Sequence, residues 1–202
     1  MTGYTLISYL IAIVGGFLSG GIMFCQIIPK LVTGIDIQAV SEDHNPGATN
    51  VFVNCGTGLG ILCLILDLLK GFLPILLASI FLDRSNLLFG IVLAAPVLGH
   101  AIAPFHHFHG GKCIATSFGE MLALLPFQKI GLLLAALYII FSTVIKIQPN
   151  RVRSLVVYGL FGLISAIVLT HSGEDSIALG CVLISLTAII KHSRYFARKN
   201  LS

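Results

Sequence analysis

Three polar stretches interrupt an otherwise apolar sequence, and they carry most of the side chains that could do chemistry. The first, SEDHNPGATN at residues 41–50, combines two carboxylates with a histidine and two asparagines. Its proline and glycine impose a turn, and Asn45, Thr49 and Asn50 have side chains that bond readily to nearby backbone. Non-helical backbone at membrane depth survives only where it is buried in protein or lines a watery cavity. The stretch is therefore either part of a pocket or an ordinary solvated loop.

The second stretch, DLLKG at residues 67–71, lies deep within an apolar segment. A charged residue inside a membrane span costs about 2.5–3.5 kcal/mol on insertion scales. Asp67 and Lys70 are three positions apart, so a helix places them on one face, where they can neutralise each other. Two hypotheses follow: a structural ion pair between helices, or a site in which Lys70 binds an anion.

The third stretch begins GHAIAPFHHFHGGK at residue 99. Gly110 and Gly111 allow the backbone to approach a ligand closely, and Lys112 adds a positive charge just before a predicted helix that contains Thr116. Glycines, a lysine and the first amides of a helix together indicate a phosphate-binding site. The pattern lacks the glycine spacing of a P-loop.

Histidines 100, 106, 107 and 109 and the neighbouring Cys113 also raise the hypothesis of a zinc or copper site. Their spacing matches no common closed site, and no carboxylate nearby in sequence could orient the imidazoles. We therefore expect no metal and no cofactor.

The elements that must position these stretches are membrane helices. Of 202 residues, 56% are hydrophobic and only 10% are charged, whereas a soluble domain carries about 25% charged residues. The composition predicts an all-α integral membrane protein, with residues 1–202 forming a single polytopic domain. Its surroundings are the lipid bilayer, and we expect no nucleic-acid partner.

A helix needs roughly 20 apolar residues to cross a bilayer, and on this criterion we expect about seven spans. They are placed at 4–28, 57–82, 86–103, 113–126, 128–146, 154–171 and 174–191. Nine lysines and arginines then fall in loops on one side and two on the other, with Lys70 inside the membrane. The positive-inside rule puts the N-terminus outside and the C-terminus in the cytoplasm. This orientation gathers the polar loops on the cytoplasmic face.

In their order and spacing, the three stretches resemble the motifs of the bacterial membrane acyl-phosphate:glycerol-3-phosphate acyltransferase family, the PlsY type. NPGATN is similar to its motif Ser-Gly-Asn-x-Gly-Ala-Thr-Asn, DLLKG to Asp-x-x-Lys-Gly, and FHHFHGGKCIAT to Phe-Lys-Gly-Gly-Lys-Gly-x-Ala-Thr. The resemblance covers nearly the whole chain. The matching positions are Asn45, Gly47, Thr49, Asn50, Asp67, Lys70, His100, Gly110, Gly111, Lys112 and Thr116, and His192 aligns with a histidine of the family's C-terminal tail.

Four polar positions depart from the family pattern. Asp43 stands where the family has serine, Val53 where it has arginine, His109 where it has lysine, and Tyr195 where it has asparagine. Two of these changes remove a fixed positive charge. The acceptor site is therefore where we expect this chain to differ from its relatives.

The resemblance implies transfer of a fatty acyl group from acyl phosphate to the 1-hydroxyl of glycerol 3-phosphate, or of a related polyol. The products are lysophosphatidic acid and inorganic phosphate, and the site faces the cytoplasm at the plasma (inner) membrane. The resemblance assigns catalysis to Lys112 and to His192 as acid, base or phosphate contact. Asp43 departs from the family, and its carboxylate is predicted to act as a base on the acceptor or to contact an uncharged or cationic one. The substrate-binding group comprises Asn45, Gly47, Thr49, Asn50, Lys70, His100, His109, Gly110, Gly111 and Thr116.

Two other functions stay open at this point. The lost cations suit a paralogue that is non-catalytic or that uses another acceptor. A small-molecule transporter needs polar residues across the bilayer midplane, where the sequence offers only Asp67, Lys70 and Glu120.

Overall fold

The structure, a computed structural model, describes residues 3–199, with side chains from residue 5 to residue 193. Ten α-helices and one π-helical turn occur in this part of the chain, and no strand does. The helices are α1 (Gly3–Gly21), α2 (Phe24–Thr33), α3 (Ile37–Val40), α4 (Ala48–Cys55), α5 (Thr57–Phe81), α6 (Leu88–Ile102), α7 (Ile114–Leu124), α8 (Gly131–Ile139), the π-helical η1 (Ile140–Val144), α9 (Asn150–His171) and α10 (Asp175–Lys199). The all-α prediction is confirmed. The side chain of Tyr195 lies outside the described residues.

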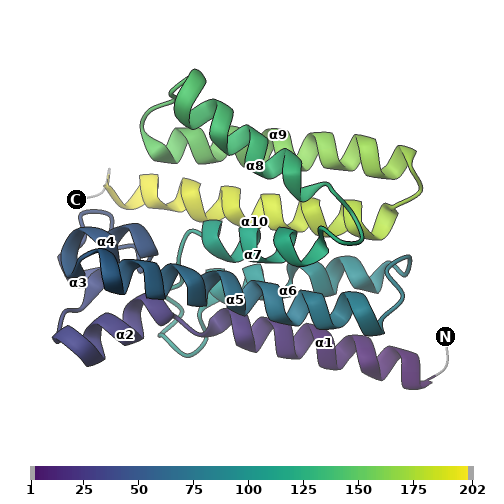
Figure 1. Ribbon diagram of the computed structural model, residues 1–202, viewed down its shortest axis with the longest axis horizontal. Coiled ribbons are helices and arrows are strands. Elements are labelled where there is room, and N and C mark those ends of the chain that lie inside the picture. Colours follow the sequence, from purple (N-terminus) through teal and green to yellow (C-terminus); the bar gives the residue numbers. More distant parts are fainter. Residues whose placement is uncertain (1–2, 200–202) are drawn as a thin grey trace.

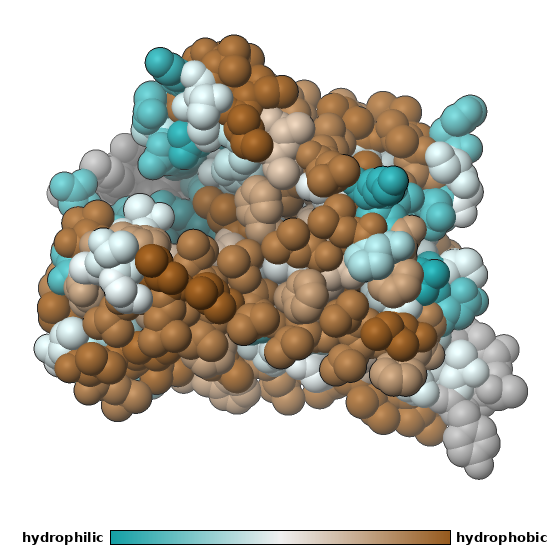
Figure 2. All heavy atoms as spheres, in the orientation of Figure 1, coloured by the Kyte–Doolittle hydropathy of each residue, from teal (hydrophilic) through white to brown (hydrophobic). Residues whose placement is uncertain are grey.

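The longest helices run side by side along the long axis of the molecule (Figure 1). Helix α10 lies in the middle and packs on both α9 and α6, while α1 packs on α6 and α5 packs on α7. The short helices α2, α3 and α4 gather at one end, where the C-terminal end of α10 also lies. Apolar side chains cover most of the face seen in Figure 2, and hydrophilic ones gather at both ends. This distribution is the one expected of a bundle whose middle contacts lipid.

Among the described residues, four helical segments are long and apolar enough to cross a membrane: Thr5–Thr33, Thr57–Phe81, Asn150–His171 and Asp175–Ser193. Three shorter apolar helices span Leu88–Ile102, Ile114–Leu124 and Gly131–Val144. Each of these seven segments overlaps one of the seven predicted spans, and the first extends to Thr33 instead of ending at residue 28. The count of seven spans stays a prediction, because the three shorter helices fall below the length of a typical span.

One continuous helix was predicted for residues 4–28, and this prediction is wrong, because the first apolar segment is divided into two helices. Helix α1 ends at Gly21 and α2 begins at Phe24, so the helical hydrogen-bond pattern is interrupted at Ile22. The carbonyl oxygen of Ile22 instead accepts a hydrogen bond from Lys70 Nζ at 2.6 Å. An apolar membrane segment can break only where its freed backbone groups find such partners.

Small residues set the close spacing of α5 and α7. A Cβ added to Gly119 would collide with the carbonyl oxygen of Leu68, and one added to Gly71 would collide with the carbonyl oxygen of Thr116. The two backbones therefore touch without intervening side chains, as is common in membrane bundles. This contact fixes the start of α7, and hence Lys112 just before it, relative to α5.

We expect Gly119→Ala to destabilise the fold by about 1–3 kcal/mol, because backbone atoms cannot yield to the added methyl group. The measurement is the thermal unfolding midpoint of the purified protein in detergent. Gly159→Ala is the matched control, since a Cβ there meets nothing within 4 Å. Equal midpoints for the two variants would contradict the assigned contact.

Candidate active site

A cavity of about 390 Å³ lies among α4, α5, α7, α9 and α10. It brings together eight of the predicted site residues from all along the chain: Asp43, Asn45, Gly47, Thr49, Asn50, His100, Lys112 and His192. Leu64, Leu68 and Phe118 add an apolar wall. Polar groups and an apolar wall in one cavity suit a ligand with a charged head and a hydrocarbon tail.

An ion pair between Asp43 and Lys112 is the central contact of the polar wall, with Lys112 Nζ 2.5 Å from Asp43 Oδ2. Asn50 Nδ2 donates to Asp43 Oδ1 at 2.8 Å and to the carbonyl oxygen of Asn45 at 2.7 Å. The backbone amide of Asn45 also donates to Asp43 Oδ1, at 3.2 Å. The first polar stretch is thus folded around one carboxylate, and that carboxylate holds the lysine of the third stretch.

The pKa of Asp43 is lowered from its ordinary value. Partial burial acts to raise this pKa, but the hydrogen bonds from Lys112 and Asn50 and the charge of Lys112 outweigh burial. Asp43 is therefore ionised at neutral pH and balances the charge of Lys112.

The Asp43–Lys112 ion pair should make the stability of the fold depend on pH in the acid range. Because the pKa of Asp43 is lower in the folded chain, its ionisation stabilises the fold above the ordinary Asp pKa of about 3.9. That stabilisation is lost as the pH falls through the lower, folded-state pKa. We expect the wild type to lose more thermal stability than Asp43→Asn between about pH 5 and pH 3. Parallel unfolding midpoints over this range would show that Asp43 contributes no pH-dependent stability.

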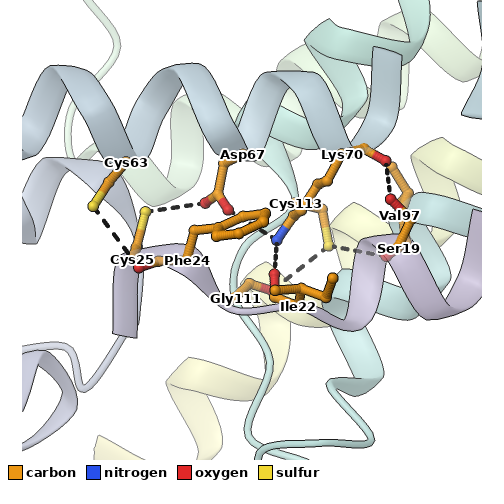
Figure 3. Close-up of polar contacts among 10 residues, drawn as sticks. All are labelled: Ser19, Ile22, Phe24, Cys25, Cys63, Asp67, Lys70, Val97, Gly111 and Cys113. Atoms are coloured by element: carbon orange, nitrogen blue, oxygen red, sulfur yellow. Dashed lines mark hydrogen bonds and ion pairs between the residues drawn. The ribbon is translucent and has the colours of Figure 1, made fainter. Parts of the chain in front are cut away.

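Lys70 lies outside the cavity and forms a second, buried ion pair with Asp67, 2.9 Å from Nζ to Oδ1 (Figure 3). Its side chain is only 1% exposed, and Nζ also donates to the carbonyl oxygen of Ile22. Cys25 Sγ donates to the other oxygen of Asp67 at 3.1 Å. These contacts join α5 to the break between α1 and α2. The geometry favours the structural ion pair over the predicted anion-binding role of Lys70.

The glycine pair packs against α6 instead of lining the cavity. The amide of Gly111 donates to the carbonyl oxygen of His100 at 3.2 Å, and a Cβ on either Gly110 or Gly111 would collide with His100. The Gly111 amide is therefore occupied within the protein. The glycines bring the backbone that precedes Lys112 against His100, whose Nδ1 has no hydrogen-bond partner among the described residues.

Two further predicted residues also lie elsewhere. Thr116 is fully buried at the contact of α5 and α7, and His109 lines a separate hollow together with Lys30 and Gln38. By contrast, His192 lies on the cavity wall, 2% exposed and facing the backbone of Lys112. Within the described part of the chain, no three His, Cys, Asp or Glu side chains converge as metal ligands would.

Comparison with known proteins identifies the family. Residues 10–199 match the protein family described as glycerol-3-phosphate acyltransferase. The chain belongs to this family. A glycerol-3-phosphate acyltransferase of Hydrogenobaculum sp. is 33% identical over 187 residues, which are 93% of this chain and 90% of the relative. Another from Syntrophotalea carbinolica is 31% identical over 191 residues, covering 95% and 93%.

Solved structures agree with this assignment. The crystal structure of PlsY (YgiH), an integral membrane glycerol 3-phosphate acyltransferase, in its glycerol 3-phosphate form aligns with a TM-score of 0.79 and 28% identity, covering 96% of this chain and 92% of that one. The lysophosphatidic acid form of the same protein aligns with a TM-score of 0.77. The predicted family and the multi-pass membrane fold are thereby confirmed.

The cavity is also lined by polar residues that lie outside the three motif stretches and were not predicted as site residues. Asn150, Arg151, Arg153 and Ser154, all from the first turns of α9, line it. The two arginines were counted only among the charges that orient the chain. Their position at the start of a predicted span, on the same side as the motif loops, is the signal that could have indicated a role in the site.

Proposed function

We propose that this chain transfers a fatty acyl group from acyl phosphate to the 1-hydroxyl of glycerol 3-phosphate, forming lysophosphatidic acid and inorganic phosphate. Its family membership supports this activity, together with the cavity in which Lys112, Asn50 and His192 face one space beside the apolar wall. The wall suits the acyl chain, and the polar groups suit the phosphates.

The reaction needs little covalent help from the protein. The 1-hydroxyl oxygen attacks the acyl carbonyl carbon, the bond between that carbon and the phosphate oxygen breaks, and phosphate leaves with the electron pair. His192 takes the hydroxyl proton, and Lys112 stabilises the negative charge that develops on the carbonyl and phosphate oxygens. Asn45, Thr49 and Asn50 orient the acceptor hydroxyls, so that positioning supplies much of the rate.

We further propose that residues 1–202 form one polytopic domain of seven spans in the inner (plasma) membrane, with the N-terminus outside and the cavity facing the cytoplasm. The unequal distribution of lysine and arginine between alternate loops supports this orientation. Both polar substrates then reach the cavity from the cytoplasm.

Purified protein in lipid, given acyl phosphate and labelled glycerol 3-phosphate, is expected to form labelled lysophosphatidic acid. The Asp43–Lys112 pair favours one alternative, a paralogue with another acceptor, because the carboxylate repels an acceptor phosphate placed beside Lys112. Phosphate release with an uncharged polyol, and none with glycerol 3-phosphate, would establish that alternative. Absence of acyl transfer to every acceptor would refute the proposed activity.

A further inference from the structure

The charges on the cavity wall do not cancel. Asp43 is paired with Lys112, and Asp67 is paired with Lys70 behind the wall. Arg151 and Arg153 add two guanidinium groups from α9. These pairings leave the α9 side of the cavity positively charged, and a partly buried cation is costly unless it is paired.

Arg153 is the less engaged of the two arginines. Arg151 donates to the carbonyl oxygen of Ser193 at 3.4 Å and so ties α9 to α10. Arg153 makes no hydrogen bond or ion pair with the residues that the structure describes, and its Nε is buried. A guanidinium group held at a cavity wall without a carboxylate partner is suited to bind a phosphate through two parallel hydrogen bonds.

The residue at position 53 shows why the acceptor phosphate needs a cation from another part of the cavity. The family pattern has an arginine at this position, but this chain has Val53. Its side chain is 78% exposed and does not line the cavity. Lys112 cannot easily serve a second phosphate, because Asp43 neutralises it and would repel a further anion. The cation for the acceptor must therefore come from another element.

We propose that Arg153 binds the phosphate of the acceptor, glycerol 3-phosphate, and so supplies from α9 the guanidinium that is missing at position 53 of α4. The first turn of α9 adds a favourable dipole, since Asn150 begins a 22-residue helix at the same wall. Lys112, which is paired with Asp43, is left for the donor phosphate. This inference rests on the proposed function and concerns the choice of acceptor within it.

Steady-state kinetics of Arg153→Gln in lipid provide the test. We expect the KM for glycerol 3-phosphate to rise roughly 10- to 100-fold, the effect of losing a charge-assisted hydrogen-bonded contact. The KM for acyl phosphate stays within about twofold of the wild type, and Arg153→Lys shows a smaller rise because it keeps the charge but loses the fork. With glycerol, which has no phosphate, the variant and the wild type transfer acyl groups equally well.

Arg84→Gln is the matched control. It removes a guanidinium that lies over the Phe127 ring, 4.3 Å from its centroid and outside the cavity, and should leave the KM for glycerol 3-phosphate unchanged. A rise in the KM for acyl phosphate instead, or an equal loss of activity with glycerol and glycerol 3-phosphate, overturns the proposal.

Calorimetric binding of glycerol 3-phosphate without donor separates the proposed function from the assignment of Arg153. If the wild type binds but forms no product, the proposed function fails, and weaker binding by Arg153→Gln still supports the assignment. If the wild type forms lysophosphatidic acid and Arg153→Gln matches it, only this assignment fails.

Discussion

Lys112→Ala is expected to lower kcat by about 10²- to 10³-fold, the cost of removing one preorganised group that stabilises charge in a transition state. Among the residues whose side chains the structure describes, Lys112 is the only lysine on the cavity wall, and Asp43 and the packing of Gly111 against His100 hold it in place. Initial rates of lysophosphatidic acid formation in lipid, at saturating glycerol 3-phosphate, measure the effect.

One complication is that Lys112→Ala leaves Asp43 without its partner. The double variant Asp43→Asn, Lys112→Ala removes both charges. The side-chain oxygen of the new asparagine can still accept the hydrogen bonds from Asn50 and from the amide of Asn45. We expect this double variant to unfold close to the wild-type midpoint and yet to remain as slow as Lys112→Ala. Lys129→Ala, at an exposed position outside the cavity, should leave turnover unchanged. Wild-type turnover in Lys112→Ala would remove Lys112 from the reaction.

Contacts within the first polar stretch could be predicted from the sequence because turn chemistry acts over a few residues. Asn50 donates to the carbonyl oxygen of Asn45, as the asparagines around a proline–glycine turn suggest. Its second bond, to the carboxylate of Asp43, was not predicted. The apolar segments could be predicted for a similar reason, because a helix in lipid must satisfy its backbone hydrogen bonds within its own segment. What escaped the sequence analysis was the partner of each group across the fold.

Two assignments show this difference. The glycine pair could serve either a ligand or a packed helix, because the absence of a side chain permits both, and the structure places the pair against His100. The charge of Lys70 was recognised as unusual, but its partner at Ile22 lies in a helix break inside an unbroken apolar run. An apolar run indicates burial or lipid contact and does not state where its backbone hydrogen bonds stop.

Arg153 could not be assigned for the same reason. In the sequence it is one of several basic residues that set the orientation of the chain, and only the folded structure places it on the cavity that residues of α4 and α7 also line. In the proposed assignment, Arg153 of α9, which lines the cavity, takes the role of the arginine that the family pattern has at position 53 of α4. A motif comparison registers the loss of the arginine at Val53 but not the presence of Arg153 on the cavity wall.

His192→Asn is expected to reduce kcat by about 10²- to 10⁴-fold, the usual contribution of a positioned general base. His192 is the imidazole of the cavity that faces the backbone of Lys112, and its burial limits the water that could replace it as proton acceptor. If His192 acts as the base, kcat falls to a similar extent with glycerol 3-phosphate and with glycerol, and the KM for each substrate changes little.

A phosphate contact would give a different pattern. The KM for acyl phosphate would rise in His192→Asn while kcat at saturating donor would be largely kept, and the base assignment would then be wrong. His171→Asn, an exposed histidine on α9 outside the cavity, is the matched control and should behave as the wild type. Because the leaving phosphate is itself a base, the residual rate of His192→Asn has a clear physical source. That rate should rise with pH if the phosphate takes the proton directly, since the phosphate dianion is the stronger acceptor.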